Sequence, residues 1–372
     1  MKQVRTASVK LNISVEEILP TMQLYTKAFN LVCQVGFEKK TSNGITLHKL
    51  TYASIKESLA LPSQLNISAR MKASDTLESV FSKIKNKKKL SRCPRSKLCS
   101  IRLDKNSYTL FLQKKLVSIL TINGRKKFIL NIPKYFEEYF TWRNTSADLV
   151  IRKNKVYLKI VFERELPEIQ PNGKFVGIDR GINNLAVTSN NKFYGGGKVK
   201  YVCERYRLLR EALQEKGTKS AKRHLRKLSD RERRFKADVN HCIAKDIMSS
   251  LEDGTIIVLE DLSGIRNRRL RKAQRILINN WNFFQLELIL RGLGESRGIY
   301  VKYIDPRYTS QRCSRCGYIH KSNRKSQSIF CCKKCGFKHN ADLNAAKNIC
   351  LKYLDSTGYP DTAAVNQPIV SA

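Results

Sequence analysis

The chain has 372 residues, with 71 lysines and arginines against 31 aspartates and glutamates, a formal net charge of +40. Hydrophobic residues make up 41% of it, enough to build folded cores and too many for a disordered basic tail. No run of 18 apolar residues occurs, which excludes a membrane span, and the N-terminus lacks a secretion signal. We therefore expect an intracellular protein (cytoplasm or nucleoid) that is not secreted and that binds a polyanion, most commonly nucleic acid.

The basic residues are concentrated in two tracks. Residues 198–236 contain 15 Lys/Arg against 5 acids, and residues 266–275 contain six basic residues and no acid. Such tracks are typical of contact with phosphate groups, whereas solubilising charge is scattered evenly. Aromatic residues near them could stack on bases, although aromatic residues at helical spacing more often belong to a core: Tyr201, Tyr206, Trp281, Phe283 and Phe284.

The N-terminal part changes its periodicity twice. Residues 4–14 alternate like a strand, and Ser14 with Glu17 then forms a capping-box pattern that opens a helical stretch. Apolar residues follow at helical spacing, at Ile18, Met22, Tyr25 and Phe29, and a second helical stretch covers roughly residues 76–84. From residue 98 to about 165 the period is two, and Asn123-Gly124 predicts a hairpin. We therefore predict an antiparallel β-barrel from residues 1–14 and 97–172, carrying a helical insertion at 15–96.

Residues 167–173 (PEIQPNG) read as a linker, after which strands and helices follow one another in a new order. The expected elements are strands at 174–179, 184–189 and 192–194, basic helices over about 200–251, a strand at 255–260, a helix over about 281–297, a strand at 300–304 and a helix at 342–353. This is the element order of an RNase H-like domain, which we place at 173–307 and 338–355. The polar tail at 356–372 is expected to be disordered.

Three carboxylates stand at topologically related places in this order. Asp179 and Glu260 each end an apolar strand, and Asp342 opens the last helix, where Ala345 and Ala346 lie on its face. The small alanines would let the helix approach the sheet closely, so we expect the three acids to converge and hold Mg²⁺. Each acid alone also fits a structural role such as helix capping. Asp261 is the nearest alternative to Glu260, and Asp230 and Asp253 read as surface acids.

Five of the eleven cysteines crowd into residues 313–335. The pairs Cys313/Cys316 and Cys332/Cys335 form a C-x₂-C…C-x₂-C pattern with 15 residues between them, and a glycine follows each pair. Four thiolates match a closed, structural Zn²⁺ site, so we predict a zinc module at 308–337. Cys331 could compete with Cys332, although only Cys332 has the x₂ spacing to Cys335. His320 and His339 are possible ligands of a variant site, and we interpret them as surface or nucleic-acid-facing residues.

Together these segments resemble the TnpB (OrfB) family of transposon-associated proteins, which is related to type V CRISPR effectors. The shared motifs are GIDRGINNLAV, the pair Asn240-His241, VLEDLSGIR, VKYIDPRYTSQRCSRCG and CKKCGFKHNADLNAAKNI, in that order within residues 174–353. The resemblance implies an α+β multidomain fold, with a RuvC-like nuclease domain, an inserted zinc module and a wedge-type N-terminal barrel. By the same resemblance Asp179, Glu260 and Asp342 are catalytic and the four cysteines bind zinc. Many relatives carry Asp-Arg-Asp where this chain has Asn340-Ala341-Asp342.

The function implied by the resemblance is Mg²⁺-dependent, RNA-guided cleavage of double-stranded DNA. A non-coding guide RNA from the transposon end would supply specificity by base pairing, the protein would read a short flanking motif, and two Mg²⁺ ions would serve phosphodiester hydrolysis. Two alternatives remain open. The first is an RNA-guided repressor that does not cleave DNA. Such a protein should have lost at least one metal-binding acid, whereas all three are present here. A strand-transferring transposase could use the same fold and acids.

Overall fold

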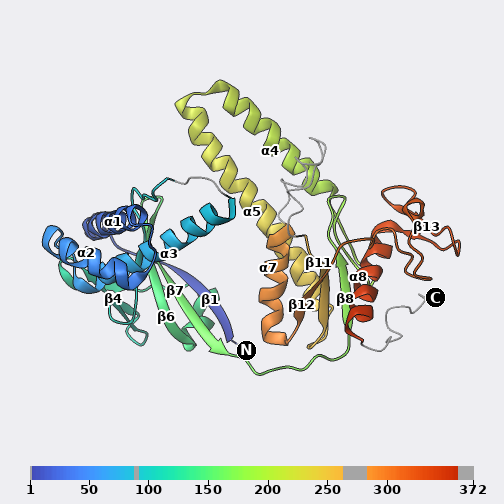
Figure 1. Ribbon diagram of the computed structural model, residues 1–372, viewed down its shortest axis with the longest axis horizontal. Helices are drawn as coiled ribbons and strands as arrows, with labels where there is room; N and C mark the ends of the chain where they lie inside the picture. Colours follow the sequence, from blue (N-terminus) through green and yellow to red (C-terminus); the bar gives the residue numbers. More distant parts are fainter. Residues whose placement is uncertain (1, 88–91, 263–282, 359–372) are drawn as a thin grey trace. The chain divides into compact units, whose positions relative to one another are not determined.

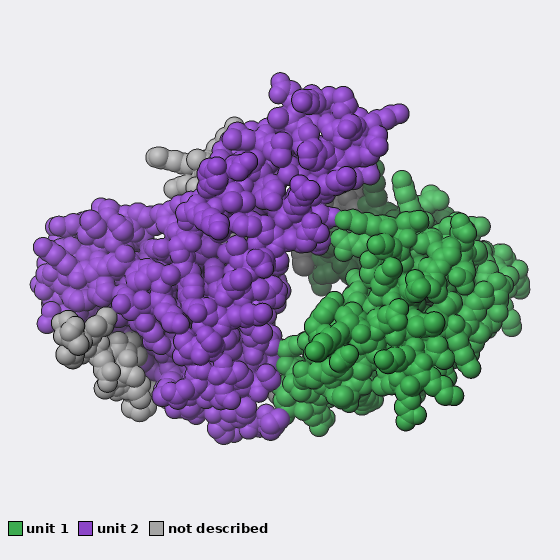
Figure 2. All heavy atoms as spheres, turned by 180° about the vertical axis from the view of Figure 1, so that it is seen from behind, with its two compact units in different colours: residues 1–166 green, residues 167–372 purple. Residues whose placement is uncertain are grey.

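The structure, a computed structural model, describes residues 2–87, 92–262 and 283–358 (Figure 1). The chain divides into two compact units, Met1–Leu166 and Pro167–Ala372, coloured separately in Figure 2. The division falls at the start of the predicted linker. The predicted basic track at 266–275, Trp281 and the tail beyond residue 358 lie outside the described residues. The tail was predicted to be disordered from residue 356, but Ser356 and Thr357 belong to the last helix.

Three helices form the insertion of the first unit: α1 (Val15–Glu38), α2 (Gly44–Ser58) and α3 (Ser63–Lys87). The predicted capping box is present, because the Ser14 hydroxyl accepts a hydrogen bond from the first turn while the Glu17 carboxylate accepts one from the Ser14 amide. The predicted stretch at 76–84 is the C-terminal part of the longer α3. The sequence pattern did not predict α2.

The strands of the first unit form two antiparallel sheets. One has the order β1-β7-β6-β2, with β1 at Lys2–Leu11, β7 at Lys155–Glu165, β6 at Arg143–Arg152 and β2 at Ile101–Leu103. The other has the order β3-β4-β5, with bounds Tyr108–Phe111, Leu116–Thr121 and Gly124–Ile129. The predicted hairpin joins β4 to β5, and Gly124 takes a φ of 82° that suits glycine. A bridge between Leu11 and Leu130 links the two sheets, and a 3₁₀ helix, η1, covers Lys134–Thr141.

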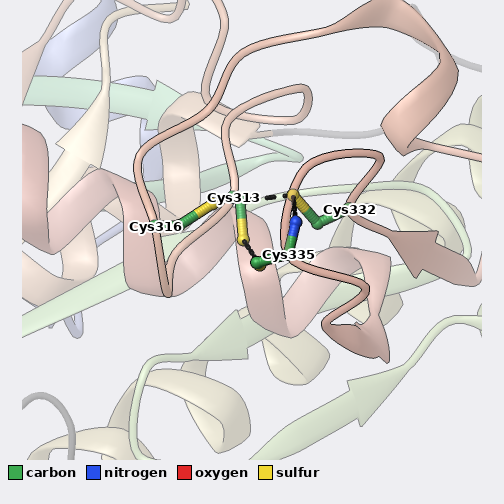
Figure 3. A group of neighbouring side chains, drawn as sticks. All are labelled: Cys313, Cys316, Cys332 and Cys335. Carbon is green, nitrogen blue, oxygen red and sulfur yellow. Dashed lines mark hydrogen bonds between the residues drawn. The ribbon is translucent and has the colours of Figure 1, made fainter.

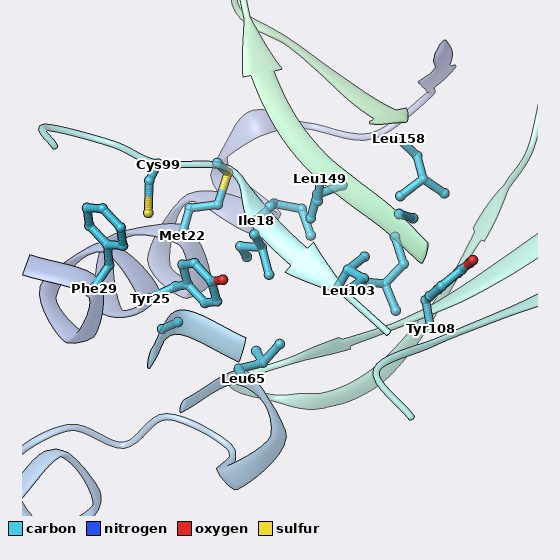
Figure 4. Packing of buried hydrophobic residues seen from close by; sticks show 14 of the residues in the cluster. Ile18, Met22, Tyr25, Phe29, Leu65, Cys99, Leu103, Tyr108, Leu149 and Leu158 are labelled. Carbon is cyan, nitrogen blue, oxygen red and sulfur yellow. The ribbon is translucent and has the colours of Figure 1, made fainter. Parts of the chain in front are cut away.

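One hydrophobic core joins these sheets to the helices (Figure 4). The predicted apolar face of α1 is buried, with Ile18, Met22 and Tyr25 each at most 1% exposed, against Leu103 and Leu149 of the sheet. Full burial of one such side chain contributes about 1.5–3 kcal/mol. The Tyr25 hydroxyl also bonds Ser68 Oγ of α3 at 3.0 Å, so the core includes a satisfied polar contact between helices.

The second unit contains a five-stranded mixed sheet with the order β10-β9-β8-β11-β12. The bounds are β8 Phe175–Asp179, β9 Asn184–Thr188, β10 Phe193–Gly195, β11 Ile256–Glu260 and β12 Tyr300–Ile304. β9 pairs antiparallel with β8 and β10, whereas β11 pairs parallel with β8 and β12. Over the described residues, the predicted order of strands and helices in this half is confirmed.

Helices cover both faces of this sheet. Residues of α5 (Lys219–Ser249) and α7 (Phe283–Gly294) pack against one face, and α8 (Ala341–Thr357) packs against the other. The predicted basic segment forms two helices, α4 (Gly197–Lys216) and α5, which separate at Gly217, where φ is 62°. Short 3₁₀ helices η3 (Glu295–Arg297) and η4 (Lys321–Asn323) and the paired strands β13 (Ile329–Cys331) and β14 (Lys338–Asn340) complete the unit. In the part of the chain that the structure describes, no helix has the length and apolarity to cross a membrane.

Candidate metal centres of the second unit

Two of the predicted acids end neighbouring parallel strands. Asp179 is the last residue of β8 and Glu260 the last of β11, and the register pairs Ile178 with Leu259 directly before them. Parallel strands bring their carboxyl ends to one edge of a sheet, so both acids leave the sheet at the same place. The backbone alone therefore makes Asp179 and Glu260 neighbours.

The third acid reaches this edge because α8 lies very close to β8. A Cβ added to Gly177 would lie 2.2 Å from the Ala346 carbonyl oxygen and 2.9 Å from the Cys350 nitrogen. Ala345 and Ala346 are buried, at 2% and 0% exposure. Small residues on both elements thus permit the close approach that the sequence predicts, and Asp342 lies in the first turn of the helix.

Asp342 is not the helix cap. Asn340 Oδ1 accepts hydrogen bonds from the backbone nitrogens of Asp342 and Leu343, at 3.0 and 3.2 Å. The Asp342 carboxylate instead accepts one bond from Asn184 Nδ2 of β9, at 2.9 Å, and one from a guanidinium nitrogen of Arg324, at 3.0 Å. A capping role for this acid is therefore excluded, and its side chain is oriented by two donors.

Glu260 is held on both its side chain and its backbone. The Thr309 hydroxyl donates to Glu260 Oε1 at 2.5 Å, and Arg180 donates to the Glu260 carbonyl at 2.6 Å. Arg180 is itself buried and pairs with Glu287 of α7 at 3.0 Å. The neighbouring Asp261 is exposed, and its backbone nitrogen bonds the Ile304 carbonyl.

The electrostatics of Asp179 reflect this crowding. Loss of solvent, then repulsion from Glu260 and Asp342, raises the pKa of Asp179 to about 8, although Arg324 and Arg180 oppose the shift. Asp261, Asp230 and Asp253 are not among these causes. The three predicted acids therefore form an electrostatic group at a site from which solvent is largely excluded.

The structure also brings together the four predicted zinc thiols (Figure 3). Their sulfur atoms lie within 4.8 Å of one another, with Cys313–Cys335 at 3.8 Å and Cys316–Cys332 at 3.6 Å. Burial opposes ionisation of Cys332, but hydrogen bonds from the backbone amides of Cys335 and Lys334 lower its pKa to about 7. Among the described residues this is the only group of His, Cys and acidic ligands gathered so closely.

The alternative ligands lie elsewhere. Cys331 pairs with Lys338 in the β13–β14 ribbon and is not part of the thiol group. His320 Nδ1 accepts from the Ser322 amide at 3.2 Å, and His339 Nδ1 accepts from the Asn340 amide at 2.8 Å. Cys332 is thus the fourth thiol, and the histidines are engaged in local backbone contacts.

Sequence reasoning missed the residues that orient the acids: Asn184, Thr309 and Arg324. Each is a polar residue in a turn-rich or strand-end segment, where polar residues are ordinary, so no local signal marks it. Only the fold brings Thr309 to Glu260 across 49 residues and Arg324 to Asp342 across 18 residues.

The basic residues of α4 and α5, the helical hairpin, fall into two groups. Arg207, Arg210 and Lys236 form ion pairs inside the hairpin, the last two with the buried Glu232. A second group forms an exposed row along α5, in which Arg233 also pairs with Asp230: Lys222, Arg223, Arg226, Lys227, Arg231, Arg233 and Arg234. Tyr201 is 64% exposed beside Arg205 and Phe284 is also exposed, whereas Tyr206 packs against the hairpin's own apolar residues. The Phe283 side chain lies outside the description.

Taken together, the second unit is a mixed α/β sheet with an acidic site at one edge and a four-thiol group between β12 and α8. The same fold occurs in a solved structure, the cryo-EM structure of a Cas12f1–sgRNA–target DNA complex, with a TM-score of 0.65 at 15% identity over 90% of this chain and 82% of that chain. The fold is thus that of Cas12-type effectors.

Sequence comparisons identify the relatives. The OrfB_IS605 family model, described as a probable transposase, matches residues 158–264, and the Cas12f1-like TNB domain model matches residues 283–349. A Cas12f1 CRISPR-associated endodeoxyribonuclease of Syntrophomonas palmitatica is 31% identical over 43% of this chain and 35% of its own. InsQ of Escherichia coli, a putative RNA-guided DNA endonuclease, is 31% identical over 52% of this chain and 53% of its own. These matches confirm the resemblance to the TnpB (OrfB) family and to Cas12f1 proteins, although the chain spans only about a third to a half of these relatives.

Proposed function

We propose that this chain is a transposon-encoded, RNA-guided DNA endonuclease whose second unit is a RuvC-like nuclease domain. The main observation in support of this proposal is the electrostatic group of Asp179, Glu260 and Asp342 at one edge of the sheet. In support, the sheet order, numbered from β8 as strand 1, is 3-2-1-4-5, which is the order of RNase H-like folds. The relatives' names, endodeoxyribonuclease and RNA-guided DNA endonuclease, agree with this chemistry.

The acids fit divalent cations on chemical grounds. Hard carboxylate oxygens are the ligands that Mg²⁺ prefers. Burial, then repulsion from Glu260 and Asp342, makes ionisation of Asp179 unfavourable, and bound cations would offset that cost. Two bound Mg²⁺ ions would supply an activated water and stabilisation of the leaving oxygen. Asn184 and Arg324 would keep the Asp342 carboxylate aimed at the site, and Thr309 would do the same for Glu260.

The four thiols fit one structural Zn²⁺ ion. With Zn–S bonds of about 2.3 Å, the sulfur atoms of a tetrahedral site lie about 3.8 Å apart. The observed Cys313–Cys335 and Cys316–Cys332 distances of 3.8 and 3.6 Å match that spacing. Four thiolates leave no open coordination position, so we assign this site to stability and not to the reaction.

The partners in this proposal are a non-coding guide RNA from the transposon end and target double-stranded DNA, met inside the cell. The exposed basic row of α5 supplies positive charge that suits a nucleic-acid backbone. The N-terminal part, in this proposal a wedge-type barrel (1–14 and 97–172) with a recognition insertion (15–96), would read the flanking motif.

The test uses the full chain purified with its own transcript. Matched and mismatched DNA targets are incubated with Mg²⁺, and the proposal predicts cleavage of the matched target only. Equal cutting of both targets, or cutting without RNA, removes the guided function. Target binding with no cut indicates a guided repressor, and joined DNA strands indicate a transposase.

A further inference from the structure

Helix α8 carries two asparagines that face away from solvent. Asn344 and Asn348 lie one turn apart and are both 0% exposed. Asn348 Nδ2 donates to the Thr309 carbonyl at 2.8 Å and to the Arg312 carbonyl at 2.6 Å. Asn344 Nδ2 donates to the same Arg312 carbonyl at 2.9 Å, and Asn344 Oδ1 accepts from the Ser314 amide at 3.0 Å. Both side chains therefore bind one short stretch of backbone, residues 309–314.

This stretch, which we call the 309–314 strap, connects the two candidate metal centres. At its start the Thr309 hydroxyl donates to the Glu260 carboxylate at 2.5 Å. At its end Cys313, a member of the thiol group, lies between the two backbone groups that the asparagines bind. The helix that holds the strap also carries Asp342. One rigid element thus fixes one acid directly and a second acid through Thr309.

The hydrogen bonds of Asn348 indicate that this residue does more than fill space in the core. Its Oδ1 is buried without a hydrogen-bond partner among the described residues, so the amide is retained for its two donor bonds. A buried unsatisfied acceptor costs about 1–3 kcal/mol. Cores tolerate such groups mainly where a function requires them. An apolar residue would fill the site without that cost, but the Thr309 carbonyl would lose its donor and the Arg312 carbonyl would keep only its bond from Asn344.

We propose that Asn348, supported by Asn344, is a positioning residue that acts through the 309–314 strap and Thr309 to orient the Glu260 carboxylate for divalent metal binding. This inference rests on the proposed metal site. The strap also makes the carboxylate site depend on the thiol group, because Cys313 anchors the strap's far end. Loss of the thiol-bound metal therefore weakens cation binding at the acids without touching them.

The test measures Mn²⁺ binding to the full chain with its bound RNA, by electron paramagnetic resonance, alongside zinc content and thermal unfolding. Thr309→Val removes the hydroxyl and leaves the Thr309 carbonyl for Asn348. Asn348→Ala removes both donors. We expect each to weaken Mn²⁺ binding about tenfold, the lower range for residues that orient metal ligands, while zinc stays at one ion per chain. The control is Lys347→Ala, which changes a half-buried residue on the same helix. This variant should bind Mn²⁺ as tightly as the wild type.

A double-mutant cycle separates positioning from general damage. If Asn348 acts through Thr309, the double variant binds Mn²⁺ no more weakly than either single variant, and extra Mg²⁺ restores cleavage in all three. Additive losses, or wild-type Mn²⁺ affinity in folded Thr309→Val, overturn the inference. Asp342→Asn distinguishes the two proposals: if it and the wild type bind Mn²⁺ equally, the acids hold no cation and the proposed function fails first.

Discussion

A single methyl group placed between β8 and α8 tests whether the close contact of these elements assembles the acids. In Gly177→Ala the new Cβ would lie 2.2 Å from the Ala346 carbonyl oxygen, whereas ordinary contact begins at 3.4 Å. The two backbones must therefore separate, by 3.4 − 2.2 = 1.2 Å to reach ordinary contact, because the obstacle is backbone and cannot rotate away. Overpacking of this kind costs about 1–3 kcal/mol.

The displacement should affect cleavage more than stability. Asp342 moves with α8 while Asp179 stays with β8, and a misplacement of about 1 Å can cost about 100-fold in rate. We expect the free energy of unfolding of Gly177→Ala to be about 1–3 kcal/mol lower than that of the wild type. We also expect this variant to cut a matched target about 100-fold more slowly.

Gly197→Ala is the matched control, since a Cβ there meets nothing within 4 Å. Both variants are compared by urea unfolding and by single-turnover cleavage of one matched target. If Gly177→Ala and Gly197→Ala cleave at the same rate, the close contact does not place Asp342, and the reasoning is wrong.

Four further predictions concern the two centres. Asp179→Ala should abolish cleavage but leave RNA and target binding nearly unchanged, measured by gel shift; retained cutting would contradict the carboxylate assignment. The raised pKa of Asp179, about 8, means that its ionisation opposes folding of the metal-free protein. The stability of the folded state with protonated Asp179 is fully present below the unfolded-state pKa of about 3.9, and it is lost as the pH rises towards 8. The advantage of Asp179→Asn in urea unfolding should therefore grow between pH 4 and 8, and a constant difference would refute the shift. Cys332→Ser should lower zinc content and unfolding temperature together, and full zinc content would exclude Cys332 as a ligand. Arg324→Ala should slow cleavage about tenfold or more at unchanged zinc content, as expected for a residue that orients a metal ligand, and unaltered cleavage would show that the contact to Asp342 is dispensable.

Local signals explain which elements of the fold could be predicted. The capping box at Ser14 and the apolar face of α1 are both encoded within one helix, and the Asn-Gly hairpin within one turn. Helix α2 was missed because only Leu47, Thr51 and Ile55 of it are buried, a narrow stripe, while Ile45 and Leu50 are exposed. A stripe of one residue per turn carries too little periodicity to be recognised.

The residues of the two candidate centres also fall into those that local sequence predicts and those that it does not. The thiol spacing and the acids at strand ends are short-range patterns. The structure gathers the four thiols, and Glu260 and Asp342 both contribute to the raised pKa of Asp179. The donors that orient them come from other segments, so their role exists only after the chain has folded. Thr309 and Arg324 lie close to the cysteines in sequence, but neither fits the cysteine pattern. Their contacts are to acids that are distant in sequence.

Asn340 shows how a departure from the relatives' pattern can be read physically. Many relatives carry Asp-Arg-Asp at this point, and this chain has Asn-Ala-Asp, which removes an arginine beside the third acid. Asn340 caps α8, so Asp342 is released from capping and remains available to Asn184 and Arg324. Arg324 donates to Asp342 from the segment between the thiol pairs, so a guanidinium contacts the third acid although none stands beside it at the helix start. In this chain the contact comes from a residue that the adjacent sequence could not indicate.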